Sequence, residues 1–236
     1  MANSYFDFKQ FRIEQGNCGM KVSTDACIQG AWTPVPDGPC RMLDVGAGTG
    51  LLSLMLAQRA PEARIDALEI DAAAATQAAE NSAASPFADR IRIHQQDVRT
   101  FEPKEPYDLI LCNPPFFINS LNSPEAARNL ARHNDTLQQA DLLRLFERTL
   151  KANGLAAVLL PFAESNLFTV LAAQHGWFLH QMLSIKDHEA AKVKRVVSVF
   201  ARIAMPVQQD VLIIKNAAGD YTPQFRKLMA PFYLHL

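Results

Sequence analysis

A chain of 236 residues is long enough to form one large domain with a sizeable buried core. Its apolar fraction of 49% and charged fraction of 20% are typical of a globular protein and argue against a disordered chain. The formal net charge of −1 excludes binding to nucleic acid through a strongly basic overall field, so any surface of that kind must be local.

The cysteines and the apolar runs indicate the cellular compartment of the protein. Cys18, Cys27, Cys40 and Cys112 form no CxxC pair, which favours reduced thiols over a disulfide framework or a zinc site. The first residues are polar, and the longest apolar run, at 155–163, is too short to cross a bilayer. We therefore expect a cytoplasmic protein that has no metal and no membrane partner.

The predicted elements alternate between strands and helices. Residues 1–30 carry aromatic side chains and glycines and predict a flap on a single domain, with a core at 31–205 and a C-terminal extension at 206–236. The predicted strands are 41–45, 64–68, 91–93, 107–112, 155–160, 178–185 and 193–203. The predicted helices are 51–60, 71–84, one that starts with a capping box at 136–139, 164–174, and one that starts at Thr222-Pro223.

This alternation is typical of an α/β fold with a mostly parallel sheet. No helical segment separates the last two predicted core strands, 178–185 and 193–203. We therefore expect an antiparallel hairpin at one edge of the sheet.

A glycine-rich turn at residues 44–50 joins the first predicted core strand to the next helix. It contains Asp44, Gly46, Ala47, Gly48 and Gly50. Glycines permit a tight turn and let the backbone approach a ligand closely. The spacing is G-x-G-x-G rather than G-x-G-x-x-G, which disfavours a dehydrogenase, and the absence of a following G-K-[S/T] excludes a P-loop.

Polar side chains stand at the ends of four successive predicted strands: Asp44, Glu69, Asp97 and Asn113. Ligands of open α/β sheets bind outside the carboxyl ends of the strands. Any one of these residues could simply cap a helix or a loop, but all four at one edge predict a ligand site. Glu69 stands where a carboxylate can accept hydrogen bonds from both hydroxyls of a ribose.

The segment that follows the strand at 107–112 reads Asn113-Pro114-Pro115-Phe116, and we call it the hook. Proline fixes φ, lacks an N–H and restricts the residue before it, so two prolines make this segment stiff and extended. A strand exit made rigid by prolines is the structural alternative. In combination with the glycine turn, the hook is expected to present its amide and its aromatic ring to a ligand.

These features together resemble the class I S-adenosylmethionine-dependent methyltransferases over residues 41–203. The resemblance implies a Rossmann-like, seven-stranded, mostly parallel sheet with one antiparallel strand and helices on both faces. It implies S-adenosylmethionine as the cofactor, S-adenosylhomocysteine as its product, and no metal. The glycine turn would approach the methionine part, Glu69 the ribose and Asp97 the adenine amine, with Ile70 and Val98 in the same cofactor site.

The hook matches the [N/D]-P-P-[Y/F] motif of methyltransferases that alkylate a nitrogen conjugated to a π system. The side chain of Asn113 and the carbonyl of Pro114 could accept both hydrogens of an exocyclic amine and so favour a localised lone pair. Pro115 would stiffen the turn and Phe116 could stack on the base. The motif does not by itself distinguish adenine, guanine and a glutamine amide.

The runs at 19–26 and 219–234 extend the similarity almost end to end, to the tRNA1(Val) adenine-37 N6-methyltransferase family. This resemblance implies an enzyme that methylates an adenine in the anticodon loop of tRNA, and we expect it to be a monomer. It also implies that Lys21, Thr24 and Asp25 fold over the cofactor. Ser23 departs from the family, in which glycine is frequent at this position.

An anticodon-loop substrate requires contacts to the RNA backbone. Two basic groups are candidates: Lys192, Lys194 and Arg195, and Arg132 and His133 after the hook. A solvated edge that guards against aggregation is the structural alternative. A protein glutamine N5-methyltransferase, a ribosomal RNA guanine N2-methyltransferase and a non-catalytic RNA-binding module remain the competing functions.

Overall fold

The computed structural model describes residues 3–19, 21–114 and 137–236. Four candidate site residues from the sequence lie outside this part of the chain: Pro115, Phe116, Arg132 and His133.

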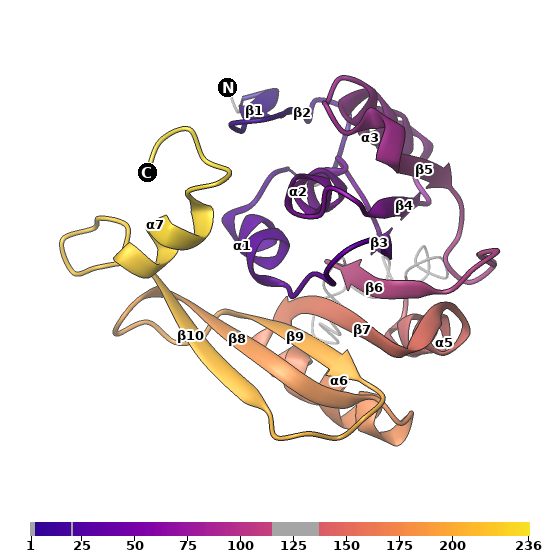
Figure 1. Cartoon of the computed structure of the whole chain (residues 1–236). Helices are drawn as coiled ribbons and strands as arrows, with labels where there is room; N and C mark the ends of the chain where they lie inside the picture. The colour runs from indigo at the N-terminus through magenta and orange to yellow at the C-terminus, as the bar shows by residue number, and fades with distance from the viewer. Residues whose placement is uncertain (1–2, 20, 115–136) are drawn as a thin grey trace, which may run out of the picture.

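An eight-stranded sheet forms the centre of the described fold, in the order β10-β8-β9-β7-β6-β3-β4-β5 (Figure 1). The strands are β3 (Arg41–Val45), β4 (Arg64–Glu69), β5 (Ile91–Gln95), β6 (Tyr107–Cys112), β7 (Leu150–Pro161), β8 (Phe178–His188), β9 (Arg195–Ala201) and β10 (Gln208–Lys215). Of these, only β9 runs antiparallel to its neighbours, β7 and β8. The predicted α/β class, with its mostly parallel sheet and one antiparallel strand, is confirmed.

The sheet has one strand more than the seven predicted. Residues 208–215 of the tail form β10, which pairs in parallel with β8 and continues the sheet beyond the β8–β9 hairpin. The expectation that this hairpin forms the edge is therefore wrong. Without β10, the backbone N–H and C=O groups on the outer side of β8 would lack sheet partners, and β10 supplies them.

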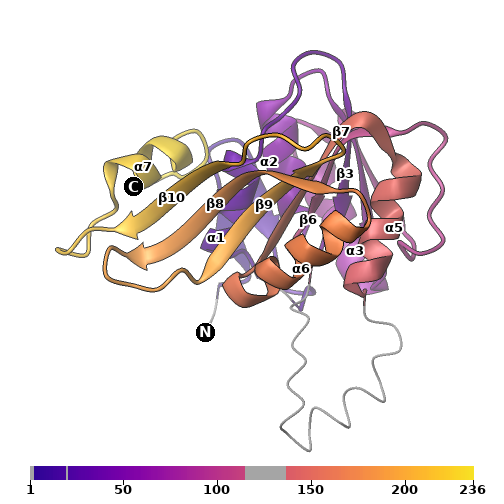
Figure 2. The same cartoon turned by 90° about the horizontal axis from the view of Figure 1, so that it is seen from below.

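Helices cover both faces of the sheet. They are α1 (Thr24–Trp32), α2 (Leu51–Arg59), α3 (Ala72–Ala83), α5 (Gln139–Thr149), α6 (Phe162–Gln174) and α7 (Pro223–Met229), with a short 3₁₀ helix η1 (Ala88–Arg90). Side chains of α1, α2 and α7 belong to one apolar cluster, and those of α5 and α6 to a second. Figure 2 shows α7 lying beside β10 at the end of the sheet. None of the described helices is both long and apolar enough to span a membrane.

The strands alternate between these two clusters, as a period of two requires. In β6, Leu109 and Leu111 contact the α1–α2 side, whereas Ile110 and Cys112 contact the α5–α6 side. Apolar side chains on both faces explain why these strands read as continuous apolar runs in the sequence.

The helix starts agree with the sequence in two of three places. Asp71 caps α3 through the N–H of Ala74, and Thr222 caps α7 with Pro223 in its first turn. The capping box predicted at 136–139 includes Thr136, which lies outside the described residues. The described part of the helix differs from that prediction, because α5 begins at Gln139 and its N-cap is Gln138. The N–H of Gln138 donates to Oδ2 of Asp141 at 3.3 Å.

The N-terminal residues form a β1 (Tyr5–Asp7) and β2 (Arg12–Glu14) hairpin followed by α1. Most of α1 is buried, and the expected end of the flap at residue 30 falls inside this helix. The division of the chain into a single domain with flap, core and extension stays a prediction.

Candidate active site

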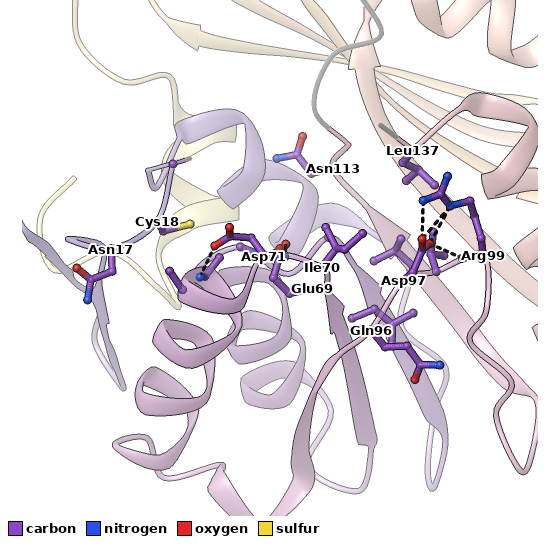
Figure 3. A pocket seen from close by; sticks show the side chains of 18 residues that line it. Asn17, Cys18, Glu69, Ile70, Asp71, Gln96, Asp97, Arg99, Asn113 and Leu137 are labelled. Carbon is purple, nitrogen blue, oxygen red and sulfur yellow. Dashed lines mark hydrogen bonds and ion pairs between the residues drawn. The ribbon is translucent and has the colours of Figure 1, made fainter. Parts of the chain in front are cut away.

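A cavity of about 600 Å³ lies at the carboxyl ends of β3, β4, β5 and β6 (Figure 3). Adjacent parallel strands bring their ends to the same edge of the sheet, and Val45 of β3 pairs in register with Cys112 of β6. The predicted residues that line the cavity are Gly46, Gly48, Glu69, Ile70, Asp97, Val98 and Asn113. Residues far apart in the sequence thus meet around one space.

The glycine turn forms the floor between β3 and α2. Gly46, Gly48 and Gly50 have φ angles of 74°, 54° and 80°, a region that side chains with a Cβ rarely adopt. The N–H groups of Gly46 and Ala47 both donate to the carbonyl of Leu68 at 2.9 Å. These two bonds fix the turn against β4.

Asp44 does not line the cavity, and it stabilises the glycine turn by hydrogen bonding to α2. Its Oδ2 accepts hydrogen bonds from the N–H of Ser53 at 3.0 Å and from the hydroxyl of Ser53 at 2.7 Å. Burial raises the pKa of Asp44 to about 6, and the charge of Glu69 acts in the same direction, whereas the bonds from Ser53 oppose it. A carboxylate at the N-terminus of α2 also interacts favourably with the helix dipole. Its direct role in cofactor binding stays a prediction, as do those of Ala47 and Gly50.

Glu69 ends β4 and faces the cavity half-buried (Figure 3). Its Oε2 accepts the N–H of Gly48 at 2.8 Å and its Oε1 accepts the N–H of Asp71 at 3.0 Å. Each carboxylate oxygen has a second lone pair that can accept another hydrogen bond. Glu69 is therefore oriented by the backbone and still able to bind two hydroxyl groups.

The loop after β5 forms the far wall. Asp97 accepts the N–H of Arg99 at 2.8 Å, and the Arg99 guanidinium binds the same carboxylate with Nε at 2.9 Å from Oδ2. The hydrogen bonds from the Arg99 side chain lower the pKa of Asp97. Arg148 of α5 donates to the carbonyl of Val98 at 3.0 Å, which ties the loop to the helix. The sequence reasoning missed Arg99 and Arg148, although Arg99 stands only two residues from Asp97.

Asn113 reaches the same cavity from the end of β6 (Figure 3). Its Oδ1 is buried, and no donor of the described chain lies within hydrogen-bond distance of it. A buried acceptor without a partner costs free energy and calls for an explanation. The next residue, Pro114, is also buried.

The N-terminal loop contributes one side of the cavity. Asn17, Cys18 and Gly19 line it. Asn81 of α3 anchors the preceding strand, because its Nδ2 donates to the carbonyls of Glu14 at 2.8 Å and Thr49 at 2.9 Å. The sequence reasoning missed this anchor, since no motif connects an alanine-rich helix with a distant hairpin.

Lys21, Thr24 and Asp25 do not line this cavity. Lys21 and Thr24 are exposed, and Asp25 forms an ion pair with Arg195 at 3.8 Å. Burial raises the pKa of Asp25, although Arg195 and Lys194 oppose this shift. Their predicted contact with the cofactor stays a prediction.

Lys192, Lys194 and Arg195 lie at the turn between β8 and β9. Since β8 is parallel to β6, this turn is at the same edge of the sheet as Asn113. Phe162, the first residue of α6, donates its N–H to the carbonyl of Lys194 at 3.4 Å and leaves 44% of its surface exposed. An aromatic ring thus stands beside the basic turn.

Comparisons with known proteins agree with this geometry. Residues 36–161 match the methyltransferase small domain family. The chain is 44% identical to a protein of Dyadobacter fermentans over 98% of both chains, and 41% identical to one of Tolumonas auensis over 100% of this chain and 99% of the other. Both relatives are named tRNA1(Val) (adenine(37)-N6)-methyltransferase.

Solved structures show the same fold at low sequence identity. A predicted O-methyltransferase from Agrobacterium tumefaciens has a TM-score of 0.68 at 17% identity, covering 88% of this chain and 96% of the other. A ribosomal protein L11 methylase from Lactobacillus delbrueckii has a TM-score of 0.56 at 15% identity, covering 81% and 84%. The fold, the cavity and the near full-length relatives place this chain in the tRNA1(Val) (adenine(37)-N6)-methyltransferase family.

Proposed function

We propose that this protein transfers a methyl group from S-adenosylmethionine to N6 of adenine 37 in the anticodon loop of valine tRNA1. The observation that carries the proposal is the buried, unpartnered Oδ1 of Asn113 among the described residues, at the edge of a cavity floored by the glycine turn. The names of the relatives support adenine over the guanine and glutamine alternatives.

The residues around the cavity fit the cofactor. Glycines at 46 and 48 leave space for close approach, and a Cβ at Gly46 would meet no heavy atom within 4 Å. Glu69 offers two oriented carboxylate oxygens for the ribose, and Asp97 with the backbone of Val98 offers an acceptor and a donor for the adenine. When bound, the cofactor supplies an electrophilic methyl group on a positively charged sulfur.

The hook supplies the chemistry that the target amine needs. The lone pair of an adenine amine is delocalised into its ring and attacks poorly. Oδ1 of Asn113 and the carbonyl of Pro114 would accept its two hydrogens and stabilise the positive charge that develops on nitrogen. The amine gains a methyl group and releases one proton to water, because an amide oxygen is too weak a base to keep it. Removing one oriented hydrogen-bonding group from an active site typically costs about 10²- to 10³-fold in kcat.

The basic turn and Phe162 support an RNA substrate. Proteins that bind single-stranded nucleic acid combine cations for the phosphates with aromatic rings for the bases. Lys192 and Lys194 are exposed at the edge that carries Asn113. Phe162 directly follows β7, which lies between the β8–β9 hairpin and β6 in the sheet. We also propose that the enzyme acts in the cytoplasm as a monomer.

The decisive experiment is labelled methyl transfer to tRNA from cells that lack the protein, followed by nucleoside analysis. N6-methyladenosine in valine tRNA1 is the expected product. Asn113→Ala should lower kcat at least 100-fold while the Kd for S-adenosylmethionine, measured by calorimetry, stays within about twofold. Asn153→Ala, at the opposite end of β7, is the matched control. A protein that binds tRNA but yields no methylated nucleoside would refute the enzymatic proposal.

The RNA surface is tested by charge reversal of Lys192, Lys194 and Arg195 to glutamate. Each lost phosphate contact on a single strand should reduce the slope of log affinity against log salt by about 0.7. Reversal of the exposed Lys104, before the start of β6, is the control. Unchanged tRNA affinity and salt slope in the triple variant would show that this turn does not contact RNA.

A further inference from the structure

We propose that Gln29, on helix α1, is a positioning residue that sets the place of Asn113 in the active site. The inference rests on the proposed function, because it concerns the amide assigned to the target amine. Gln29 lies outside the cavity and is fully buried, so it cannot contact substrate or cofactor.

Its amide joins the two strands from which the site departs. Nε2 of Gln29 donates to the carbonyl of Cys112 in β6 at 3.0 Å and to the carbonyl of Ala157 in β7 at 3.2 Å. These strands are adjacent, with Leu111 in register with Ala157. An NH₂ group has two hydrogens, so each carbonyl can take one. Gln29 therefore ties the end of β6 to the neighbouring strand β7 with a single nitrogen.

The bond to Cys112 acts directly on the next residue. The peptide unit between Cys112 and Asn113 is planar, so the carbonyl oxygen of Cys112 and the Cα of Asn113 belong to one rigid group. Holding that oxygen fixes the plane from which the Asn113 side chain extends. A rotation of the plane would move Oδ1 of Asn113 away from the amine, and an error of about 1 Å in such a geometry can cost about 100-fold in rate.

The surroundings of Gln29 make an incidental role in packing a poor explanation. Its neighbours on α1, including Ile28 and Ala31, are buried and apolar. Its own Oε1 is buried and has no hydrogen-bond partner among the described residues. Burying that oxygen unpaired costs free energy that an apolar side chain of similar size would avoid. The side-chain hydrogen bonds of Gln29 that offset this cost go to β6 and β7.

The test compares Gln29→Leu and Gln29→Met with the wild-type enzyme. Both variants keep the volume and remove the donor. We expect kcat for tRNA methylation to fall about tenfold, while the KM for tRNA and the Kd for S-adenosylmethionine change less than twofold. The control is Thr149→Val, which removes another buried donor to a backbone carbonyl, that of Leu145, on α5. This control should keep the wild-type kcat.

A second measurement does not depend on activity. Amide hydrogen exchange in the peptide that covers β6 and Asn113 should accelerate in both Gln29 variants and stay unchanged in Thr149→Val. Wild-type kcat in the variants, or an equal loss of kcat in the control, would overturn the positioning role. If the wild-type protein methylates no tRNA, the proposed function fails, and the exchange measurement still tests the link from Gln29 to Asn113.

Discussion

Replacing Asp44 with asparagine should change how the stability of this protein depends on pH. The carboxyl group is fully buried and its pKa is raised from 3.8 to about 6. One pKa unit corresponds to about 1.4 kcal/mol, so ionising Asp44 costs about 3 kcal/mol more in the folded chain than in the unfolded chain. Asparagine keeps the size and can still accept the hydrogen bonds from Ser53, but it does not ionise.

The sign follows from proton binding. Between pH 4 and pH 6 the unfolded chain has lost the Asp44 proton and the folded chain retains it. Stability falls with rising pH wherever the folded state binds more protons, so Asp44 contributes a loss of stability to the wild-type protein over this window. Asp44→Asn lacks this loss. Its free energy of unfolding relative to the wild type should therefore rise by about 3 kcal/mol from below pH 4 to above pH 6, and level off beyond.

Urea denaturation of both proteins at half-unit steps from pH 3.5 to pH 7.5 measures the difference directly. Comparing the two proteins at each pH removes the contributions of all other titrating groups, provided that both unfold in one cooperative step. A constant difference across this range would refute the reasoning, because it would mean that Asp44 titrates alike in the folded and unfolded states. A difference that falls with pH would also contradict it.

Two further substitutions test the cavity and its surroundings. Glu69→Gln should weaken S-adenosylmethionine binding about 10- to 100-fold in calorimetry, because hydrogen bonds to a charged acceptor contribute about 1.5–3 kcal/mol each. Glu105→Gln is the exposed control. Equal affinity in the wild type and both variants would show that Glu69 does not bind the cofactor. Phe162→Ala should weaken tRNA binding by about 1–3 kcal/mol in filter binding if its ring stacks on a base, without changing the salt slope. The control Phe178→Ala, at the amino end of β8, removes a similarly exposed ring and should leave tRNA affinity unchanged. If Phe162→Ala altered only the salt slope of tRNA binding, stacking would be contradicted.

The parallel core and the edge at which the cavity lies follow from patterns that are local in the sequence. Each βα unit can be recognised from neighbouring residues: an apolar run, a polar residue at its end and a helix start such as Asp71. Parallel strands must place their carboxyl ends together, so the sequence alone is enough to group Glu69, Asp97 and Asn113. The tight turn at Gly46 and Gly48 could also be predicted, because glycine is the residue that most readily adopts the positive φ angles found there.

The residues that hold and enclose that site depend instead on contacts between distant segments. Gln29 reaches Cys112 across 83 residues, and Asn81 reaches Glu14 across 67, through contacts that depend on how helices pack on the sheet and its flanking hairpin. Similarly, the residues of β10 do not by themselves specify β8 as its pairing partner. Periodicity, caps and turns are set by neighbours in the chain, and they carry no information on which distant surfaces meet. For that reason the positioning residues were invisible in the sequence, whereas the groups they position were not.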